Sequence, residues 1–137
     1  MRGRGFSLLE FLLACAIGAT LLTFAISGWQ GQQIRLYEAE ARSALIKNAL
    51  ALEQWYAKHG RYQRDKKMWP LIPVKETKFY KITFSALAEN KPEGKYRLWA
   101  EASPAIRERG ARSFLLDQDG SIVSCPKVNA RRNTCEN

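Results

Sequence analysis

Metal-binding and catalytic side chains are scarce in this sequence of 137 residues. It has a single histidine, His59, and three cysteines that form no C-x-x-C pair, which argues against a zinc finger or a zinc enzyme. Five prolines and nine glycines are too few for a collagen-like or low-complexity chain. Hydrophobic residues make up 46% of the chain and the mean hydropathy is −0.35, which excludes a protein that crosses the membrane many times. A chain of this length holds one domain with a modest core.

Acidic residues are also in the minority, and charge is unevenly distributed along the chain. Lysine plus arginine number 22 against 13 aspartate plus glutamate, a net charge of +9 that favours anionic partners or surfaces. Residues 6–29 contain one ionisable side chain, Glu10, and helical residues in this number span about 36 Å, enough to cross a bilayer. Residues 30–137 carry a net charge of +8. The sequence therefore predicts one membrane-length helix followed by a basic, water-soluble body.

The apolar segment does not end like a secretory signal peptide. Two arginines give it a basic start, but no change in composition follows it. Apolar residues instead recur every three to four positions from Ile34 onward, and Gly60 supplies a helix stop. We therefore expect one helix over about residues 6–59, compatible with lipid in its first half and amphipathic over residues 30–59. The positive-inside rule places the basic start in the cytoplasm and the body on the other side of the membrane.

The start of the chain, RGFSLLE at residues 4–10, resembles the signature of type IV prepilins. That signature joins a short basic leader to Gly, Phe, Ser or Thr, two aliphatic residues and Glu. The resemblance implies that prepilin peptidase removes residues 1–5 by cutting between Gly5 and Phe6 on the cytoplasmic face, and that the new amine of Phe6 is methylated. It also implies that residues 6–29 stay on the mature protein, anchor it in the inner membrane and later pack with other pilin subunits in the filament.

Glu10 needs an explanation of its own, because a carboxylate inside a membrane helix costs about 2.5–3.5 kcal/mol on insertion scales. In type IV pilins this carboxylate pairs with the Phe amine of a neighbouring subunit, which offsets the desolvation of both charges. The resemblance implies the same pairing between Glu10 and Phe6 during assembly. The alternative is that Glu10 merely reaches the membrane interface from its position near the helix end.

The body has the pattern of a small antiparallel sheet. Residues 61–77 form a basic loop that contains prolines, and four later segments have strand patterns, with Asp119-Gly120 as a strong hairpin signal. Trp99 alternates onto the side of the charged residues in its segment. A sheet with one apolar face needs a cover, which the apolar stripe of residues 34–56 can provide. The four segments are residues 79–84, 96–101, 114–116 and 122–123.

The predicted fold class is α+β, a pilin fold with a long N-terminal helix packed on a three- to four-stranded antiparallel sheet, and residues 30–137 as its globular head. Cys125 and Cys135 enclose a short C-terminal loop, and outside the cytoplasm we expect them to be oxidised to each other rather than free. Many pilins close this region with a disulfide, as the resemblance also implies. In the chain-entropy model such a bond contributes about 2.5–3 kcal/mol. Cys15, in the apolar segment, is expected to be an inert small hydrophobe.

No constellation of an enzyme is present in the sequence. It has no G-x-S-x-G motif, no phosphate-binding P-loop and no glycine run of a dinucleotide site. Asp117 and Asp119 fit a turn better than a catalytic pair of carboxylates. His59 has no evident Ser or Cys partner and suits the C-terminal end of a helix. We expect no enzymatic activity, no metal and no cofactor.

Basic residues gather in the predicted loops. Such cations can form a stripe that matches the spacing of phosphates, and Tyr62 and Trp69 lie among them, where they could contact sugars or bases. The alternative is a solvated basic face that aids solubility or touches anionic headgroups. The clusters are Arg61, Arg64, Lys66 and Lys67; Lys91 and Lys95; Arg107, Arg109 and Arg112; and Lys127, Arg131 and Arg132.

A second and closer resemblance favours DNA. Residues 42–62 and the following WPLIPVKE at residues 69–76 are similar to the competence pilins, the DNA-receptor minor pilins of type IV pili. In these pilins the loop after the helix, the first loop between strands and the disulfide-closed C-terminal loop carry the basic residues that contact DNA. The residues that the resemblance implies here are Arg64, Lys66, Lys67, Lys91, Lys127, Arg131 and Arg132.

The sequence thus predicts a minor type IV pilin that binds extracellular DNA for uptake in natural transformation. It would first lie in the inner membrane with its head in the periplasm, and then in the pilus at the cell surface. One alternative is a minor pilin that modulates adhesion, aggregation or pilus assembly without binding DNA. Another is a pseudopilin of a secretion system.

Overall fold

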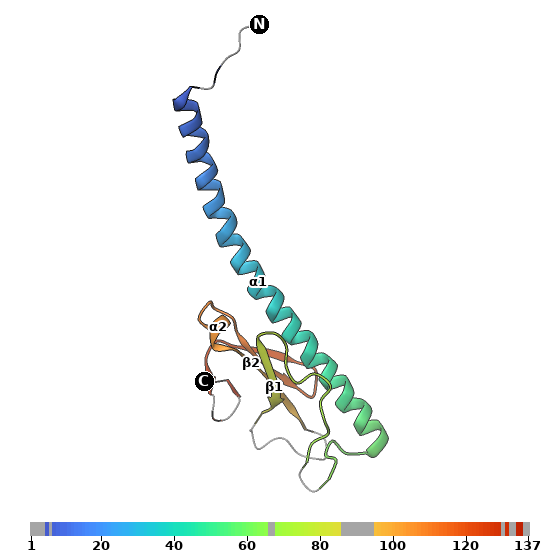
Figure 1. The fold of residues 1–137 in the computed structure, drawn as a ribbon. Coiled ribbons are helices and arrows are strands. Elements are labelled where there is room, and N and C mark those ends of the chain that lie inside the picture. Colours follow the sequence, from blue (N-terminus) through green and yellow to red (C-terminus); the bar gives the residue numbers. More distant parts are fainter. Residues whose placement is uncertain are drawn as a thin grey trace. The chain divides into compact units, whose positions relative to one another are not determined.

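The computed structural model of the chain describes residues 5, 7–65, 68–85, 95–129, 131 and 134–135. The chain divides into two compact units, Met1–Gln33 and Ile34–Asn137. A single helix, α1 (Leu8–His59), supplies the first unit and continues into the second, where it meets a sheet (Figure 1).

Helix α1 has 52 residues, and its length agrees with the prediction from the apolar pattern. Its first half exposes large apolar side chains, among them Leu9 at 76% and Phe24 at 78% of their surface. An 18-residue window near the N-terminus has a mean hydropathy of 2.1 with 0% of it buried, so by length and composition the helix can cross a membrane. The helix ends at Gly60, whose φ of 70° suits glycine and whose N–H donates to the Tyr56 carbonyl at 2.7 Å.

Four strands form one antiparallel sheet in the order β1-β2-β3-β4, as the sequence predicts. The predicted turn joins β3 to β4: Gly120 has a φ of 84°, and its N–H donates to the Asp117 carbonyl at 3.0 Å. A short helix, α2 (Pro104–Arg107), lies between β2 and β3. The strands are β1 (Tyr80–Phe84), β2 (Arg97–Ala102), β3 (Ser113–Asp117) and β4 (Ile122–Cys125).

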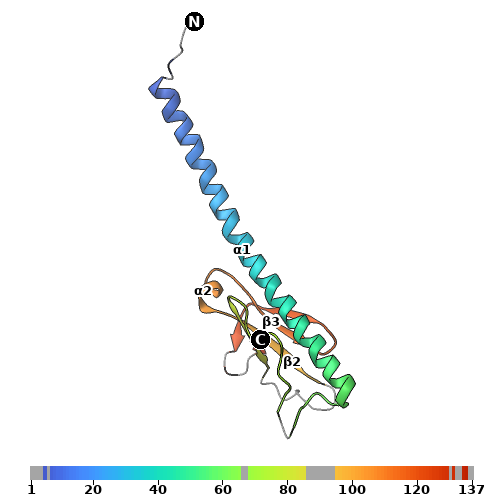
Figure 2. The ribbon, with the colours of Figure 1, turned by 45° about the vertical axis from the view of Figure 1, so that its right-hand side comes forward.

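The second half of α1 covers one face of this sheet and forms the main core with it (Figures 1 and 2). The helix contributes apolar side chains at three- and four-residue spacing, and the strands contribute every second residue, as their periods require. Burial of one leucine side chain contributes about 1.5–3 kcal/mol, so this stripe is enough to hold the helix on the sheet. The side chains with at most 1% exposure include Leu45, Leu52, Leu98, Phe114 and Leu116.

The opposite face of the sheet has a small apolar cluster of its own, which the sequence analysis did not foresee. The alternation in β2 places Trp99 on the side of charged residues, yet Trp99 is fully buried. It packs with Leu115, its direct partner on β3, and with Cys125, while the partly buried Val128 and Cys135 lie against them.

The C-terminal segment supplies this second cover. It forms a two-stranded ribbon of β5 (Val128–Asn129) and β6 (Thr134–Cys135). The predicted disulfide between Cys125 and Cys135 is present, with 5.2 Å between their Cα atoms. The prediction for Trp99 therefore differs from the structure because a covalently closed loop folds over the face that was expected to be polar.

Candidate nucleic-acid interface

The loop between α1 and β1 is fastened to the helix-facing core. The side chain of Asn48, fully buried on α1, donates to the Val74 carbonyl at 2.7 Å and accepts from the Val74 N–H at 2.9 Å. Trp69 stacks on Phe84 of β1 with ring centroids 4.7 Å apart, and Ile72 is buried in the core. An asparagine on an amphipathic helix gives no sequence signal for such a contact, since its partner is a backbone group 26 residues away.

Arg64 is exposed at a tight turn of this loop. Its N–H donates to the Met68 carbonyl at 2.7 Å, and the Met68 N–H donates to the Asp65 carbonyl at 2.7 Å. The turn thus holds the backbone of Arg64 while its guanidinium faces solvent, as a phosphate contact requires. Lys66 and Lys67, predicted to bind DNA, lie outside the described residues.

Tyr62 is placed differently from the expectation that it contacts sugars or bases. Its ring is only 6% exposed, stacks on Tyr56 at 4.6 Å between centroids, and directs its hydroxyl to the Glu53 carboxylate at 2.9 Å. Burial, and then the hydrogen bond and charge of Glu53, raise the pKa of Tyr62 to about 12. A buried ring cannot stack on a base, so this expectation is corrected, whereas Trp69 keeps part of its surface exposed.

The disulfide-closed ribbon carries two more of the predicted DNA-binding residues. Lys127 lies between β4 and β5, Arg131 lies between β5 and β6, and both are exposed. The disulfide and the packing of the ribbon on the sheet restrict where these cations can go. Lys91 and Arg132, the remaining predicted residues, lie outside the described part of the chain.

The loop that carries Arg64 and the ribbon that carries Lys127 are attached to opposite faces of the sheet. The loop of Arg64 packs on the helix-facing core through Trp69, whereas the ribbon of Lys127 packs through Val128 on the cluster around Trp99. Each loop is therefore held in place independently of the other. That both form one DNA-binding surface stays a prediction.

A capping box closes the N-terminus of α1. The Ser7 N–H donates to the Glu10 carboxylate at 3.3 Å, and the Glu10 N–H donates to the Ser7 hydroxyl at 3.3 Å. Glu10 thus has a structural role that the sequence analysis did not consider, although the spacing of Ser7 and Glu10 is a known signal for it. Gly5 is exposed and Phe6 lies outside the described residues, so their processing and the pairing of Glu10 stay predictions.

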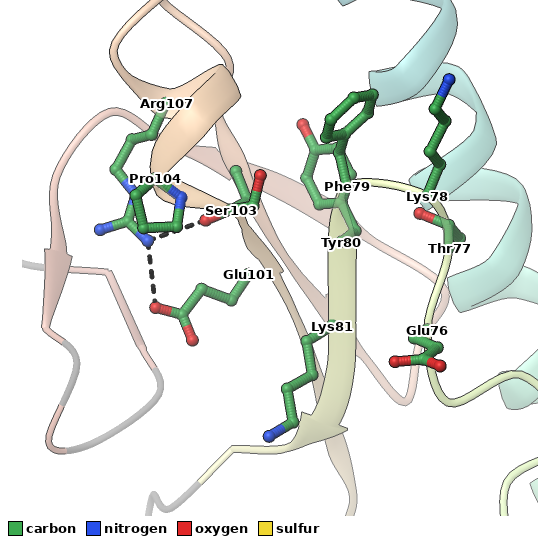
Figure 3. Close-up of a pocket in the computed structure, with 11 residues that line it drawn as sticks. Glu76, Thr77, Lys78, Phe79, Tyr80, Lys81, Glu101, Ser103, Pro104 and Arg107 are labelled. Carbon is green, nitrogen blue, oxygen red and sulfur yellow. Dashed lines mark hydrogen bonds and ion pairs between the residues drawn. The ribbon is translucent and has the colours of Figure 1, made fainter.

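A groove of about 350 Å³ lies beside β1, where the sequence predicted no site (Figure 3). Its charged lining has both signs: Lys78, Lys81 and Arg107 are cationic, and Glu76 and Glu101 are anionic (Figure 3). Arg107 donates to the Glu101 carboxylate at 3.2 Å, as the dashed line in Figure 3 shows. Because two carboxylates offset two of its three cations, this groove favours a phosphate less than the exposed Arg64 does.

The carboxylates of the β3–β4 turn have structural partners. Asp117 pairs with Arg97 of β2 at 2.6 Å, and the Ser121 N–H donates to Asp119 at 3.1 Å, which lowers the pKa of Asp119. Over the ranges that the structure describes, no group of three or more His, Cys, Asp or Glu side chains could hold a metal ion.

Comparisons with known proteins give three further findings. Residues 29–113 match the model of a family described as type IV minor pilin ComP, DNA uptake sequence receptor. The chain is similar to the solution NMR structure of the minor DNA-uptake pilin ComP from Neisseria subflava, with 36% identity, a TM-score of 0.50, and coverage of 66% of this chain and 74% of that chain. Its fold is also similar to a crystal structure of the non-core minor pilin PilV of Neisseria meningitidis, at 21% identity and a TM-score of 0.55 over 72% of this chain and 93% of that chain. No curated protein matches the chain.

Proposed function

The chain belongs to the ComP family of type IV minor pilins, and we propose that it binds extracellular DNA at the cell surface for uptake during natural transformation. The observation that carries this proposal is the family match over residues 29–113, which includes the exposed Arg64 and the loop that presents it. The similarity at 36% identity to a protein described as a minor DNA-uptake pilin supports it. The match ends before Lys127 and Arg131, so their role depends on their exposure and charge alone.

The proposed contact is made to the DNA backbone. Exposed arginine and lysine side chains neutralise phosphates and release the counterions condensed on them, so affinity falls steeply as salt rises. Arg64, Lys127 and Arg131 are exposed on loops whose ends are held by the core or the disulfide, which lowers the entropy lost when DNA binds. The proposed set also includes Lys66, Lys67, Lys91 and Arg132.

We assign the first unit to the membrane and the filament. In this proposal prepilin peptidase cuts after Gly5, the amine of Phe6 is methylated, and residues 6–29 hold the subunit in the inner membrane with residues 30–137 in the periplasm. The exposed apolar side chains of the first half of α1 suit lipid before assembly and other pilin subunits after it. Glu10 would then pair with the amine of a neighbouring subunit.

DNA binding can be tested on the full-length chain in detergent, with a labelled DNA duplex and fluorescence anisotropy at a series of salt concentrations. We expect Arg64→Ala, and the pair Lys127→Ala with Arg131→Ala, to weaken binding and to reduce the slope of log affinity against log salt by about one unit for each lost phosphate contact. Lys47→Ala is the matched control, because Lys47 is an exposed cation on α1 outside both loops. Its removal should change affinity least.

The same titration separates the alternatives. Salt-sensitive binding that depends on the loop cations supports the DNA-receptor function. If the parent binds no DNA, or if all variants bind as the parent does while a deletion strain transforms normally, the chain is a minor pilin for adhesion, aggregation or assembly. A deletion strain that keeps its pili but loses secretion would instead indicate a pseudopilin.

A further inference from the structure

Glu53, near the C-terminal end of α1, is shared by two loops. One oxygen of its carboxylate accepts a hydrogen bond from the Tyr62 hydroxyl at 2.9 Å and another from the Tyr96 hydroxyl at 3.3 Å. The two tyrosine rings also meet edge to face, with centroids 4.9 Å apart. We call Glu53, Tyr62 and Tyr96 the Glu53 clamp.

The Glu53 clamp joins segments that are far apart in the sequence. Tyr62 lies in the loop after α1, whereas Tyr96 immediately precedes β2, at the end of the connection from β1. Both tyrosines are buried, at 6% and 2% exposure, so the contact between their rings is part of the core, while Glu53 is exposed at the edge of that core. Burial, and then the Glu53 carboxylate, also raise the pKa values of both tyrosines.

Exposed cations flank both tyrosines. Arg61 directly precedes Tyr62 and Arg64 follows two positions later, while Lys95 directly precedes Tyr96. The Arg61 guanidinium also donates to the Arg64 carbonyl at 3.4 Å, which ties the two arginines of the first loop together. We call Arg61, Arg64 and Lys95 the two-loop patch. The contact between the tyrosine rings brings the two parts of this patch to the same corner of the head.

We infer that the Glu53 clamp positions the two-loop patch so that its cations bind neighbouring phosphates of one DNA backbone, an inference that rests on the proposed DNA-binding function. Glu53 is then a positioning residue that touches no DNA, and Arg61 and Lys95 join Arg64 as phosphate contacts. Nearby cations on two tethered loops bind one polyanion more tightly than cations on loops that move independently, because less freedom is lost on binding.

The charge of Glu53 and its positioning role predict opposite effects of its removal on DNA affinity, so the two can be separated by experiment. A carboxylate close to a phosphate-binding patch repels DNA, so its charge alone weakens binding. If Glu53 acted only through its charge, its removal would tighten binding. If it acts by holding the two loops, its removal loosens the two-loop patch and weakens binding.

The experiment measures binding of full-length variants in detergent to a labelled DNA duplex across a salt series. We expect Glu53→Ala to weaken binding about threefold to tenfold and to reduce the salt slope by about one unit, as the loss of one phosphate contact would. Glu53→Gln removes the charge but keeps an oxygen that can accept from both tyrosines, so it should bind at least as tightly as the parent. Tyr62→Phe changes no charge at neutral pH and removes one hydrogen bond of the clamp, so it should weaken binding.

Two controls separate positioning from general stability. Glu40→Ala removes an exposed carboxylate from the same helix outside the clamp and should not weaken binding. In a double-mutant cycle, the effects of Arg64→Ala and Lys95→Ala on the free energy of DNA binding should be coupled in the parent and additive in the Glu53→Ala background. A general loss of stability would not produce this difference. All titrations are made well below the unfolding midpoint of each variant.

The outcomes distinguish this inference from the proposed function. Tighter binding by both Glu53→Ala and Glu53→Gln would show that the carboxylate acts by charge alone, and would overturn the inference while DNA binding stands. Unchanged binding by Glu53→Ala and Tyr62→Phe would overturn it too. If the parent shows no salt-dependent binding, the proposed function fails first and the inference fails with it.

Discussion

The two faces of the sheet are covered by different means. On the helix-facing side α1 and the loop after it pack on the sheet in a cluster of sixteen buried apolar residues, with no covalent bond across it among the described residues. On the opposite side the cluster has three buried residues, Trp99, Leu115 and Cys125, and one of them belongs to a disulfide. Burial stabilises a fold in proportion to the apolar area removed from water. The large cluster is therefore stable through packing alone, whereas the small cluster is supplemented by a disulfide.

The difference extends to the loops that carry cations. The loop of Arg64 is held by hydrogen bonds and packing, which involve Asn48, Trp69 and the Glu53 clamp. The ribbon of Lys127 and Arg131 is short and has little to pack, so the Cys125–Cys135 bond restricts it instead. Four changes, given in decreasing order of their effect, test this contrast.

The largest effect is expected in the helix-facing core. Leu45→Ala should lower the free energy of unfolding by about 2–5 kcal/mol, because it leaves a cavity between α1 and the sheet. Leu45 has 0% exposure, whereas Leu50 on the same helix is 59% exposed, so Leu50→Ala is the matched control and should change stability little. Denaturant unfolding followed by circular dichroism measures both. Equal losses for the two variants would contradict the proposed division of the helix into a core face and a free face.

The second effect concerns the disulfide. Replacing Cys125 and Cys135 together by Ser should lower the free energy of unfolding by about 2.5–3 kcal/mol, because the unfolded chain gains the conformational entropy that the disulfide removes. It should also weaken DNA binding, since Lys127 and Arg131 lose their fixed loop, whereas Leu45→Ala at a temperature where it is folded should not. Anisotropy titrations beside unfolding curves test this. Full DNA affinity in the double serine variant would show that the covalent bond serves stability only.

A smaller effect is expected at Asn48. Asn48→Ala leaves the Val74 N–H and carbonyl without their partner, and a buried polar group left unpaired costs about 1–3 kcal/mol. Ser43→Ala, at an exposed position on the same helix, is the control and should be nearly neutral. Hydrogen exchange of the Val74 amide should become faster in Asn48→Ala. An unchanged exchange rate would mean that the loop is held by Trp69 and Ile72 alone.

The last effect appears only at high pH, so it is the smallest near neutral pH. Burial, together with nearby carboxylates, raises the pKa of Tyr62 to about 12 and also raises those of Tyr80 and Tyr96, all of which lie in the helix-facing core. A group whose pKa is raised on folding contributes its full stability below its unfolded value of about 10 and loses that contribution as the pH rises through the folded value. The free energy of unfolding should therefore fall above about pH 10. Between about pH 10 and pH 12, the free energy of unfolding of Tyr62→Phe should fall less steeply than that of the parent. An identical fall in urea unfolding curves would show that ionisation of Tyr62 does not contribute.

Much of the fold follows from local patterns in the sequence. The apolar segment of residues 6–29 and the repeat of apolar residues from Ile34 to Tyr56 give α1 and its buried face, and the Asp119-Gly120 pair gives the turn between β3 and β4. The pair of cysteines gives the disulfide. These features depend on residues close in the chain or on one strong chemical preference, so a single sequence is enough to predict them.

The features that were missed depend on contacts between distant segments. Trp99 alternates with charged residues, and nothing near it shows that the ribbon after Cys125 folds over it. Tyr62 lies among cations, but its ring packs in the core and its hydroxyl donates to Glu53, nine residues earlier. The bond from Asn48 to Val74 joins a side chain to a backbone group, which no pattern of residue types records. Sequence reasoning can therefore find a basic loop without finding what holds it.

The capping box at the start of α1 affects how much the Glu10 contact can contribute to the assembly of subunits. Ser7 and Glu10 satisfy each other within a single chain, at 3.3 Å in both directions. In the proposed filament, Glu10 would therefore exchange one partner for another instead of gaining a first one. The free energy that this contact releases is then the difference between two sets of hydrogen bonds, which is smaller than the strength of the new set alone. In this proposal, a subunit that leaves the filament returns to a state in which its carboxylate again accepts the hydrogen bond of Ser7.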